Sequence, residues 1–258
     1  MTARRTASWR AFRHHEGMAR RLTGTAVILH GAGSDATFIR SAFAQPLARV
    51  GLRLIAPEDR TGDPALMSAR LRQLMARCRD VRIVGGVSVG AHAVLRWAAR
   101  DQRSAELDGL LIAMPAWIGR HDNVADLTAG SAHILKRDGV SAELLRMRLD
   151  QSIPRDWVMT ELSRSWPRQA DTLADTLLRT ATSRGPYLSE LSRIALPVGI
   201  AALADDPLHP VAVARAMHRR LRQSRLHVID RSAPAESHSA IGYAALDVLM
   251  QARQRSHF

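Results

Sequence analysis

Cysteine is almost absent from this sequence of 258 residues, because Cys78 is the only one. The chain therefore cannot form an internal disulfide or a cysteine-based metal site, and a lone thiol suits a reducing compartment. The histidines and carboxylates also lack the spacing of a metal site, so we expect neither a metal nor another cofactor. The basic start of the chain is not followed by the long apolar run that a signal peptide or membrane helix requires. We expect a cytoplasmic protein that does not associate with a membrane.

Lysine is equally scarce, since Lys136 is the only one among 37 basic residues. The formal net charge is nevertheless +13, and nearly all of it comes from arginine. These arginines are spread through predicted helices such as Ala69–Arg79 and Ala214–Arg225, without the interleaved aromatic residues of a nucleic-acid surface. We therefore interpret them as solvated helix faces and expect no nucleic-acid partner. A basic surface would still attract anionic substrates or acidic proteins.

Short β-branched runs alternate with amphipathic stretches on either side of a central block, which is typical of a mostly parallel sheet flanked by helices. At this length, with 46% hydrophobic residues, the chain can bury a substantial core. The predicted strands are Thr25–His30, Leu52–Pro57, Val81–Gly86, Asp108–Pro115, Leu196–Leu203 and Arg225–Asp230. The predicted helices between and after them are Phe38–Arg49, Pro64–Arg79, Val89–Arg100, Val211–Arg222 and Ser239–Gln254.

The strand pattern disappears between Ala116 and Gly185, where only helices are predicted. They cover Asn123–Arg137, Ser141–Leu149, Arg155–Ser165 and Gln169–Thr182. Gly139 separates the first two of them. An all-helical block inside a regular α/β order predicts an insertion over one edge of the sheet, and ligands bind at that edge if it carries the carboxyl ends of the strands.

The strongest local motif is GVSVG, residues 86–90, which lies between a predicted strand and a predicted helix. A serine hydroxyl is a weak nucleophile that must be presented on a sharp turn, and glycines two residues away on either side let the backbone close tightly. The motif predicts Ser88 as a nucleophile. The alternative is an ordinary turn in which Ser88 caps the helix.

The second motif is HGAG, residues 30–33, directly after the first predicted strand. Acyl transfer places negative charge on a carbonyl oxygen, which fixed backbone N–H groups can stabilise. The N–H groups of Ala32 and Val89 are the candidates. A glycine-rich turn after a strand can also hold a dinucleotide phosphate, but here Ala36 takes the third glycine position and no acidic residue closes the next strand at Ile55.

In this order and separation, the two motifs resemble the α/β-hydrolase superfamily. The resemblance implies a core of residues 1–115 and 186–258, with residues 116–185 as a helical cap. It also implies early strands within the first 24 residues, where only Trp9–Arg13 looks extended, so we expect the front of the sheet to be reduced.

The resemblance further implies that the catalytic acid and base follow the nucleophile, each in a loop after a late strand. ADDPLHP, residues 204–210, is similar to the family's D-P-x-x-P turn, which aligns Asp206 with the acid and leaves Asp205 as the alternative. His238, just ahead of the final helix, takes the place of the base. The other histidines considered are His30, His92 and His227, expected to be structural, and His121 and His133 in the inserted block, for which packing is the better interpretation.

These assignments predict two-step acyl transfer. Ser88 would attack a carbonyl while His238 removes its proton, and the N–H groups of Ala32 and Val89 would hold the oxyanion. An aspartate nucleophile, as in haloalkane dehalogenases and epoxide hydrolases, is disfavoured. Four cap side chains are candidates for an apolar substrate wall, with packing among cap helices as the alternative: Trp117, Trp157, Met159 and Trp166.

The favoured function is hydrolysis of a carboxylic ester, thioester or lactone of small to medium apolar acyl groups. The basic surface adds a thioester of coenzyme A or of an acidic acyl-carrier protein as a candidate substrate. A carbon–carbon bond hydrolase or an acyltransferase would use the same triad. The alternative from another class is a non-catalytic binding protein that keeps the hydrolase fold. The oligomeric state stays open.

Overall fold

A computed structural model describes residues 22–120, 123–150 and 156–255. Its centre is a single six-stranded sheet in which every neighbouring pair is parallel, in the order β2-β1-β3-β4-β5-β6. The strands are β1 (Gly24–Leu29), β2 (Leu52–Ile55), β3 (Val81–Val87), β4 (Gly109–Ala113), β5 (Val198–Leu203) and β6 (Ser224–Ile229). The extended segment predicted at Trp9–Arg13 lies outside the described residues.

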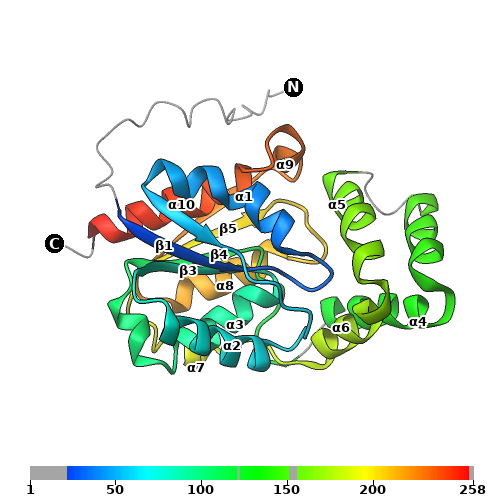
Figure 1. The fold of residues 1–258 in the computed structure, drawn as a ribbon, viewed down its shortest axis with the longest axis horizontal. Helices are drawn as coiled ribbons and strands as arrows, with labels where there is room; N and C mark the ends of the chain where they lie inside the picture. Colours follow the sequence, from blue (N-terminus) through cyan, green and yellow to red (C-terminus); the bar gives the residue numbers. More distant parts are fainter. Residues whose placement is uncertain (1–21, 121–122, 151–155, 256–258) are drawn as a thin grey trace.

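Helices cover both faces of the sheet (Figure 1). The elements of the core are α1 (Ala36–Arg49), α2 (Pro64–Arg77), α3 (Val89–Ala98), the short 3₁₀ helix η2 (Gln102–Glu106), α7 (Leu188–Leu191), α8 (Val211–Arg220), α9 (Ala233–Glu236) and α10 (Ala240–Arg255). None of the helices in the described ranges is both long and apolar enough to cross a membrane. The predicted α/β class with a mostly parallel sheet is confirmed.

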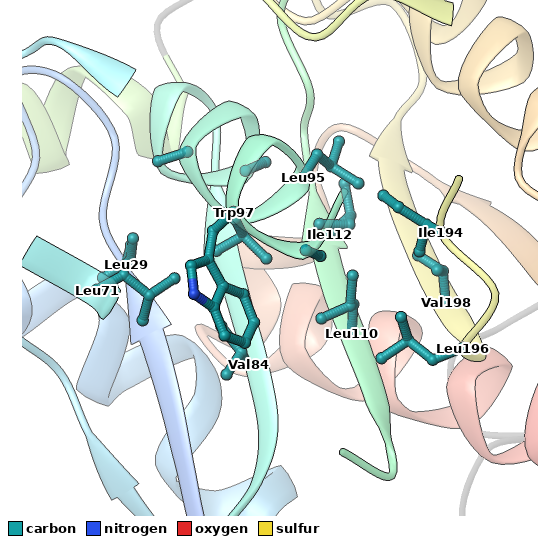
Figure 2. Close-up of a cluster of buried hydrophobic side chains, with 14 of the residues drawn as sticks. Leu29, Leu71, Val84, Leu95, Trp97, Leu110, Ile112, Ile194, Leu196 and Val198 are labelled. Carbon is teal, nitrogen blue, oxygen red and sulfur yellow. The ribbon is translucent and has the colours of Figure 1, made fainter. Parts of the chain in front are cut away.

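The alternation of side chains along the strands divides the hydrophobic core into two layers. In β1, Val27 and Leu29 belong to the layer that also contains side chains of α2, α3 and α8, whereas Ala26 and Ile28 belong to the layer of α1 and α10. Figure 2 shows the first layer, in which the fully buried Trp97 lies between side chains of several strands. The central strands β4 and β5 are buried on both faces and are continuous apolar runs, whereas the edge strands β2 and β6 are partly exposed and contain arginine.

The inserted helices lie between β4 and β5 in the chain, and they are placed beyond one end of the sheet (Figure 1). They comprise α4 (Asn123–Leu149), α5 (Trp157–Ser165), the 3₁₀ helix η3 (Trp166–Gln169) and α6 (Ala170–Thr182). Gly139 interrupts α4 with non-helical backbone angles (φ 80°, ψ 173°), at the residue where the sequence predicts a break. The insertion has its own core, which includes Leu135, Trp166 and Leu173.

Three hydrogen bonds show which end of the sheet the insertion covers. Ser165 Oγ donates to the carbonyl of Gly33, after β1, over 2.8 Å. Thr176 Oγ1 donates to the carbonyl of Arg60, after β2, over 2.7 Å. Trp157 Nε1 donates to the carbonyl of Arg231, after β6, over 3.0 Å. All three acceptors follow the carboxyl ends of parallel strands, which is the edge where ligands bind in such sheets.

Candidate active site

Ser88 occupies the turn between β3 and α3 with backbone angles of φ 54° and ψ −121°. A positive φ costs a non-glycine residue about 1–3 kcal/mol, so the surrounding structure must impose it. The flanking glycines explain how the turn closes. A Cβ on Gly86 would lie 2.3 Å from the carbonyl carbon of Gly90, and a Cβ on Gly90 would lie 2.6 Å from the carbonyl oxygen of His30. The Ser88 hydroxyl makes no capping hydrogen bond, so the alternative role as a helix cap does not apply.

The HGAG turn lies beside this serine. A Cβ on Gly31 would come within 3.0 Å of the Ser88 Cβ and 3.6 Å of its Oγ, so only glycine leaves this space open. Val89 is the first residue of α3, where a helix N–H has no intrahelical acceptor. Among the residues of the structure, neither the Val89 N–H nor the Ala32 N–H has a hydrogen-bond acceptor. Two unpaired donors therefore flank the serine, as an oxyanion site requires.

His30 holds the HGAG turn in place from inside the core. Its side chain is 2% exposed, and its Nε2 accepts a hydrogen bond from the Asp59 N–H over 2.9 Å. Nε2 is thus the unprotonated nitrogen, and Nδ1 donates to the carbonyl of Gly31 over 2.8 Å. With both ring nitrogens engaged, His30 links the turn after β1 to the loop after β2.

Asp206 is buried in the loop after β5, whereas its neighbour Asp205 is exposed. One carboxylate oxygen accepts from the backbone N–H groups of Leu208 (3.0 Å) and His209 (3.3 Å). The other accepts from His209 Nδ1 at 2.9 Å, and Arg231 Nη1 lies 3.5 Å from the carboxylate. Burial raises the pKa of Asp206, but the neighbouring His209 and the hydrogen bonds outweigh it and lower the pKa to about 2.

His238 lies in the segment between α9 and α10 and is exposed. It forms no hydrogen bond or ion pair with any other residue that the structure describes. The structure thus brings Ser88 together with the HGAG turn and buries Asp206, but the histidine bonded to Asp206 is His209. The sequence prediction did not include His209. The sequence feature that could have indicated His209 is its position three residues after Asp206. In such a turn the aspartate carboxylate accepts from the backbone N–H groups of the next residues, which also brings the His209 side chain close to it.

Comparison with protein-family models finds no match, and comparison with curated proteins finds none either. Solved structures do match. An enol-lactonase from Burkholderia xenovorans LB400 has a TM-score of 0.70 at 14% identity, covering 88% of this chain and 91% of that chain. A carboxylesterase structure from Nitrososphaera gargenis has a TM-score of 0.66 at 16% identity, covering 93% and 89%. An alpha/beta hydrolase enzyme from a Medee basin deep-sea metagenome library has a TM-score of 0.61 at 15% identity, covering 92% and 90%. The chain has the α/β-hydrolase fold.

Within this α/β-hydrolase fold, the inserted helices dock directly on the turn that carries Ala32. Arg164 donates two hydrogen bonds, of 2.7 and 2.8 Å, to the carboxylate of Asp35, which itself caps α1. The buried Ser165 donates to the carbonyl of Gly33. Gly33 has φ 70°, and a Cβ there would lie 2.7 Å from Trp166 Nε1. The position of η3 is therefore coupled to the HGAG turn.

The four predicted wall residues lie in three different places. Met159 and Trp166 belong to the core of the insertion. Trp157 stacks on Phe38, with ring centroids 6.0 Å apart. Trp117 is buried in a separate small cluster and lies edge-on to a histidine ring. They do not form one continuous wall, and contact of any of them with substrate stays a prediction.

Two other histidines occupy distinct environments, while His121 lies outside the described residues. His92, on α3, is fully buried, and its Nε2 accepts from the N–H groups of Ala116 (3.3 Å) and Trp117 (3.4 Å). Burial, together with the nearby His209 and Arg96, lowers the pKa of His92 to about 3, so the ring is neutral. His92 therefore holds the chain that follows β4. His133 is exposed on α4.

Proposed function

We propose that this chain is a serine hydrolase that cleaves a carboxylic ester, thioester or lactone through an acyl-enzyme on Ser88. The observation that carries the proposal is the strained turn at Ser88, which presents an uncapped hydroxyl beside the unpaired N–H groups of Ala32 and Val89. A strained residue with no structural use for its side chain is typical of a reaction centre. Matching folds among enzymes named as an enol-lactonase and carboxylesterases support the same substrate class.

In the proposed reaction, Ser88 Oγ attacks the substrate carbonyl and transfers its proton to a histidine. The carbonyl oxygen becomes negatively charged and accepts hydrogen bonds from the Ala32 and Val89 N–H groups. The protonated histidine then gives its proton to the leaving group, which departs and leaves an acyl-enzyme. Water, deprotonated by the same histidine, releases the acid and restores Ser88.

We propose His238 as this base and Asp206 as the acid that orients it. This assignment requires Asp206 to exchange one histidine for another, because its carboxylate is bonded to His209. The loop that leads to His238 begins at Arg231, which lies against Asp206 and is itself held by Asp156 of the insertion at 2.6 Å. A shift of this loop would move both Arg231 and His238. We also propose that residues 116–185 act as the cap over the substrate.

The test is covalent labelling with a fluorophosphonate, together with hydrolysis of p-nitrophenyl esters of increasing chain length. Wild type should label and turn over, whereas Ser88→Ala should do neither. His238→Ala should lose about 10²–10⁴-fold in rate. Ser41→Ala, which removes an exposed hydroxyl from α1, is the matched control and should behave as wild type.

Each alternative function gives a different result in these assays. A Ser88→Ala variant that still labels would exclude Ser88 as the nucleophile. Labelling without release of the acid would favour an acyltransferase, and turnover of a diketone would favour a carbon–carbon bond hydrolase. A wild type that neither labels nor hydrolyses any ester would instead favour the non-catalytic binding protein.

A further inference from the structure

Two hollows flank the loop that follows β2, at the edge covered by the insertion. The first has a volume of about 330 Å³ and is lined by residues of α1, this loop and η3, including Arg60, Arg164 and Arg168. The second, of about 440 Å³, lies on the other side of the loop and is lined by Arg60, Arg70 and Arg179 among others. Arg60 belongs to both, so the two hollows form one arginine-lined region.

Three of these arginines form no salt bridge with another described residue. In the first hollow, Asp35 is bonded to Arg164, and Glu58 accepts from the N–H of Ala36 at 3.0 Å. In the second, Arg70 lies 3.2 Å from Asp59. No carboxylate of the described chain lies within 4.0 Å of the guanidinium groups that remain. These belong to Arg60, Arg168 and Arg179.

The backbone beneath Arg60 is fixed by helix α6. Thr176 Oγ1 donates to the Arg60 carbonyl (2.7 Å), Arg179 Nε to the Thr61 carbonyl (2.6 Å) and Thr180 Oγ1 to the Gly62 carbonyl (2.8 Å). Gly62 has φ 66°, and a Cβ there would lie 2.2 Å from the Thr176 carbonyl oxygen. This loop therefore fits only one way against α6. It fixes the backbone of Arg60, whose exposed side chain begins between the two hollows.

The same region adjoins the candidate active site. Asp35, in the lining of the first hollow, lies three residues after Ala32, and Ser165, also in the lining, donates to the Gly33 carbonyl. The lining of the first hollow therefore reaches the segment that follows the HGAG turn, and a substrate bound at both places would span this segment. Guanidinium groups bind phosphate through paired, charge-assisted hydrogen bonds.

Arg60, Arg168 and Arg179 form no salt bridge with any carboxylate of the described chain, and from their guanidinium groups in these hollows we infer a binding site for the phosphate groups of the substrate, which is then a phosphate-bearing thioester of the coenzyme A type. The identification of the substrate as a thioester rests on the proposed function. Binding of phosphate by the arginines does not depend on catalysis.

The first experiment measures binding without turnover. Coenzyme A is titrated by calorimetry into Ser88→Ala, and then into the same protein carrying Arg60→Gln and Arg168→Gln. We expect binding to the first protein and a loss of about tenfold or more in affinity for the second, because hydrogen bonds to charged groups are lost. Arg215→Gln is the control. Arg215 is an exposed arginine on α8, and α8 packs on β5 and β6, whereas the hollows lie beside the loop after β2, the strand at the opposite side of the sheet. It should bind as Ser88→Ala does.

The second experiment compares thioesters that differ only in phosphate. Hexanoyl-coenzyme A should have a higher kcat/KM than hexanoyl-pantetheine, which lacks phosphate, and the arginine variants should reduce this ratio about tenfold. Hexanoyl-4′-phosphopantetheine shows which phosphate the arginines bind. A rate near that of hexanoyl-coenzyme A assigns the site to the phosphate on the pantetheine, as on a carrier protein. A lower rate assigns the site to the nucleotide phosphates.

The outcomes separate the two proposals. If coenzyme A does not bind to Ser88→Ala, or if Arg215→Gln weakens binding as much as the Arg60 and Arg168 variants do, the phosphate site is wrong and the charge acts only as a general basic surface. If coenzyme A binds through these arginines but no ester or thioester is cleaved, the phosphate site stands and the hydrolase proposal fails.

Discussion

His209→Val should activate the protein rather than inactivate it. In the structure, His209 Nδ1 donates to the buried carboxylate of Asp206 over 2.9 Å. A hydrogen bond to a charged group contributes about 1.5–3 kcal/mol, so this bond reduces the fraction of molecules in which Asp206 is free for His238 by about ten- to a hundredfold. Valine removes the donor. The neighbouring Arg231 and two backbone N–H groups still keep Asp206 ionised.

The assay is the second-order rate of fluorophosphonate labelling at pH 7.5. We compare wild type, His209→Val, His238→Gln and the double variant. His209→Val should label about tenfold faster than wild type, and His238→Gln should label at least a hundredfold more slowly. The double variant should be as slow as His238→Gln, because a free Asp206 has no other histidine to orient.

The opposite pattern would refute the reasoning. If His209→Val loses about a hundredfold and His238→Gln keeps the wild-type rate, then His209 is the base and Asp206 already holds its catalytic partner. An unchanged rate in His209→Val would show that the bond between His209 and Asp206 does not limit assembly of the triad.

Two further predictions concern stability. The pKa of Asp206 is lowered from 3.8 to about 2, so the charge of Asp206 contributes about 2 kcal/mol to stability, which is present above pH 4 and is lost as the pH falls toward 2. The difference in unfolding free energy between wild type and Asp206→Asn should therefore shrink by about 2 kcal/mol between pH 6 and pH 2. A difference that stays constant over this range would contradict the prediction. Arg164→Met leaves the partly buried Asp35 without its ion-pair partner and should lower the free energy of unfolding by about 1–3 kcal/mol in urea titrations, whereas Arg137→Met, at an exposed pair with Asp138, should have much less effect.

The sheet and the nucleophile turn could be predicted because their signals are local. Strands such as Gly109–Ala113 are buried on both faces and appear in the sequence as continuous apolar runs. Gly86 of GVSVG is required by a contact within five residues, because a Cβ there would meet Gly90, whereas Gly90 is required by the distant carbonyl of His30. Gly139 likewise ends a helix through its own backbone angles.

The docking of the insertion could not be predicted in the same way. Arg164 and Asp35 are 129 residues apart in sequence, and nothing in a chain of 37 basic residues distinguishes this arginine from the others. The unpaired guanidinium of Arg60 is equally invisible, since it depends on where the carboxylates of other elements lie. Pairing of charges is a property of the folded arrangement, whereas the sequence gives only the charges themselves.

The partner of Asp206 depends on distance along the chain as well as on chemistry. His209 follows it by three residues, so their bond closes a very short loop and costs little entropy. His238 follows Asp206 by 32 residues, in the segment after β6, and this segment begins at Arg231, whose guanidinium lies between Asp156 of the insertion and Asp206. The local histidine is thus the one bonded to Asp206 in the structure. Arg231 also joins Asp206 to Asp156, which directly precedes α5, so the insertion and the candidate acid share one network of ion pairs.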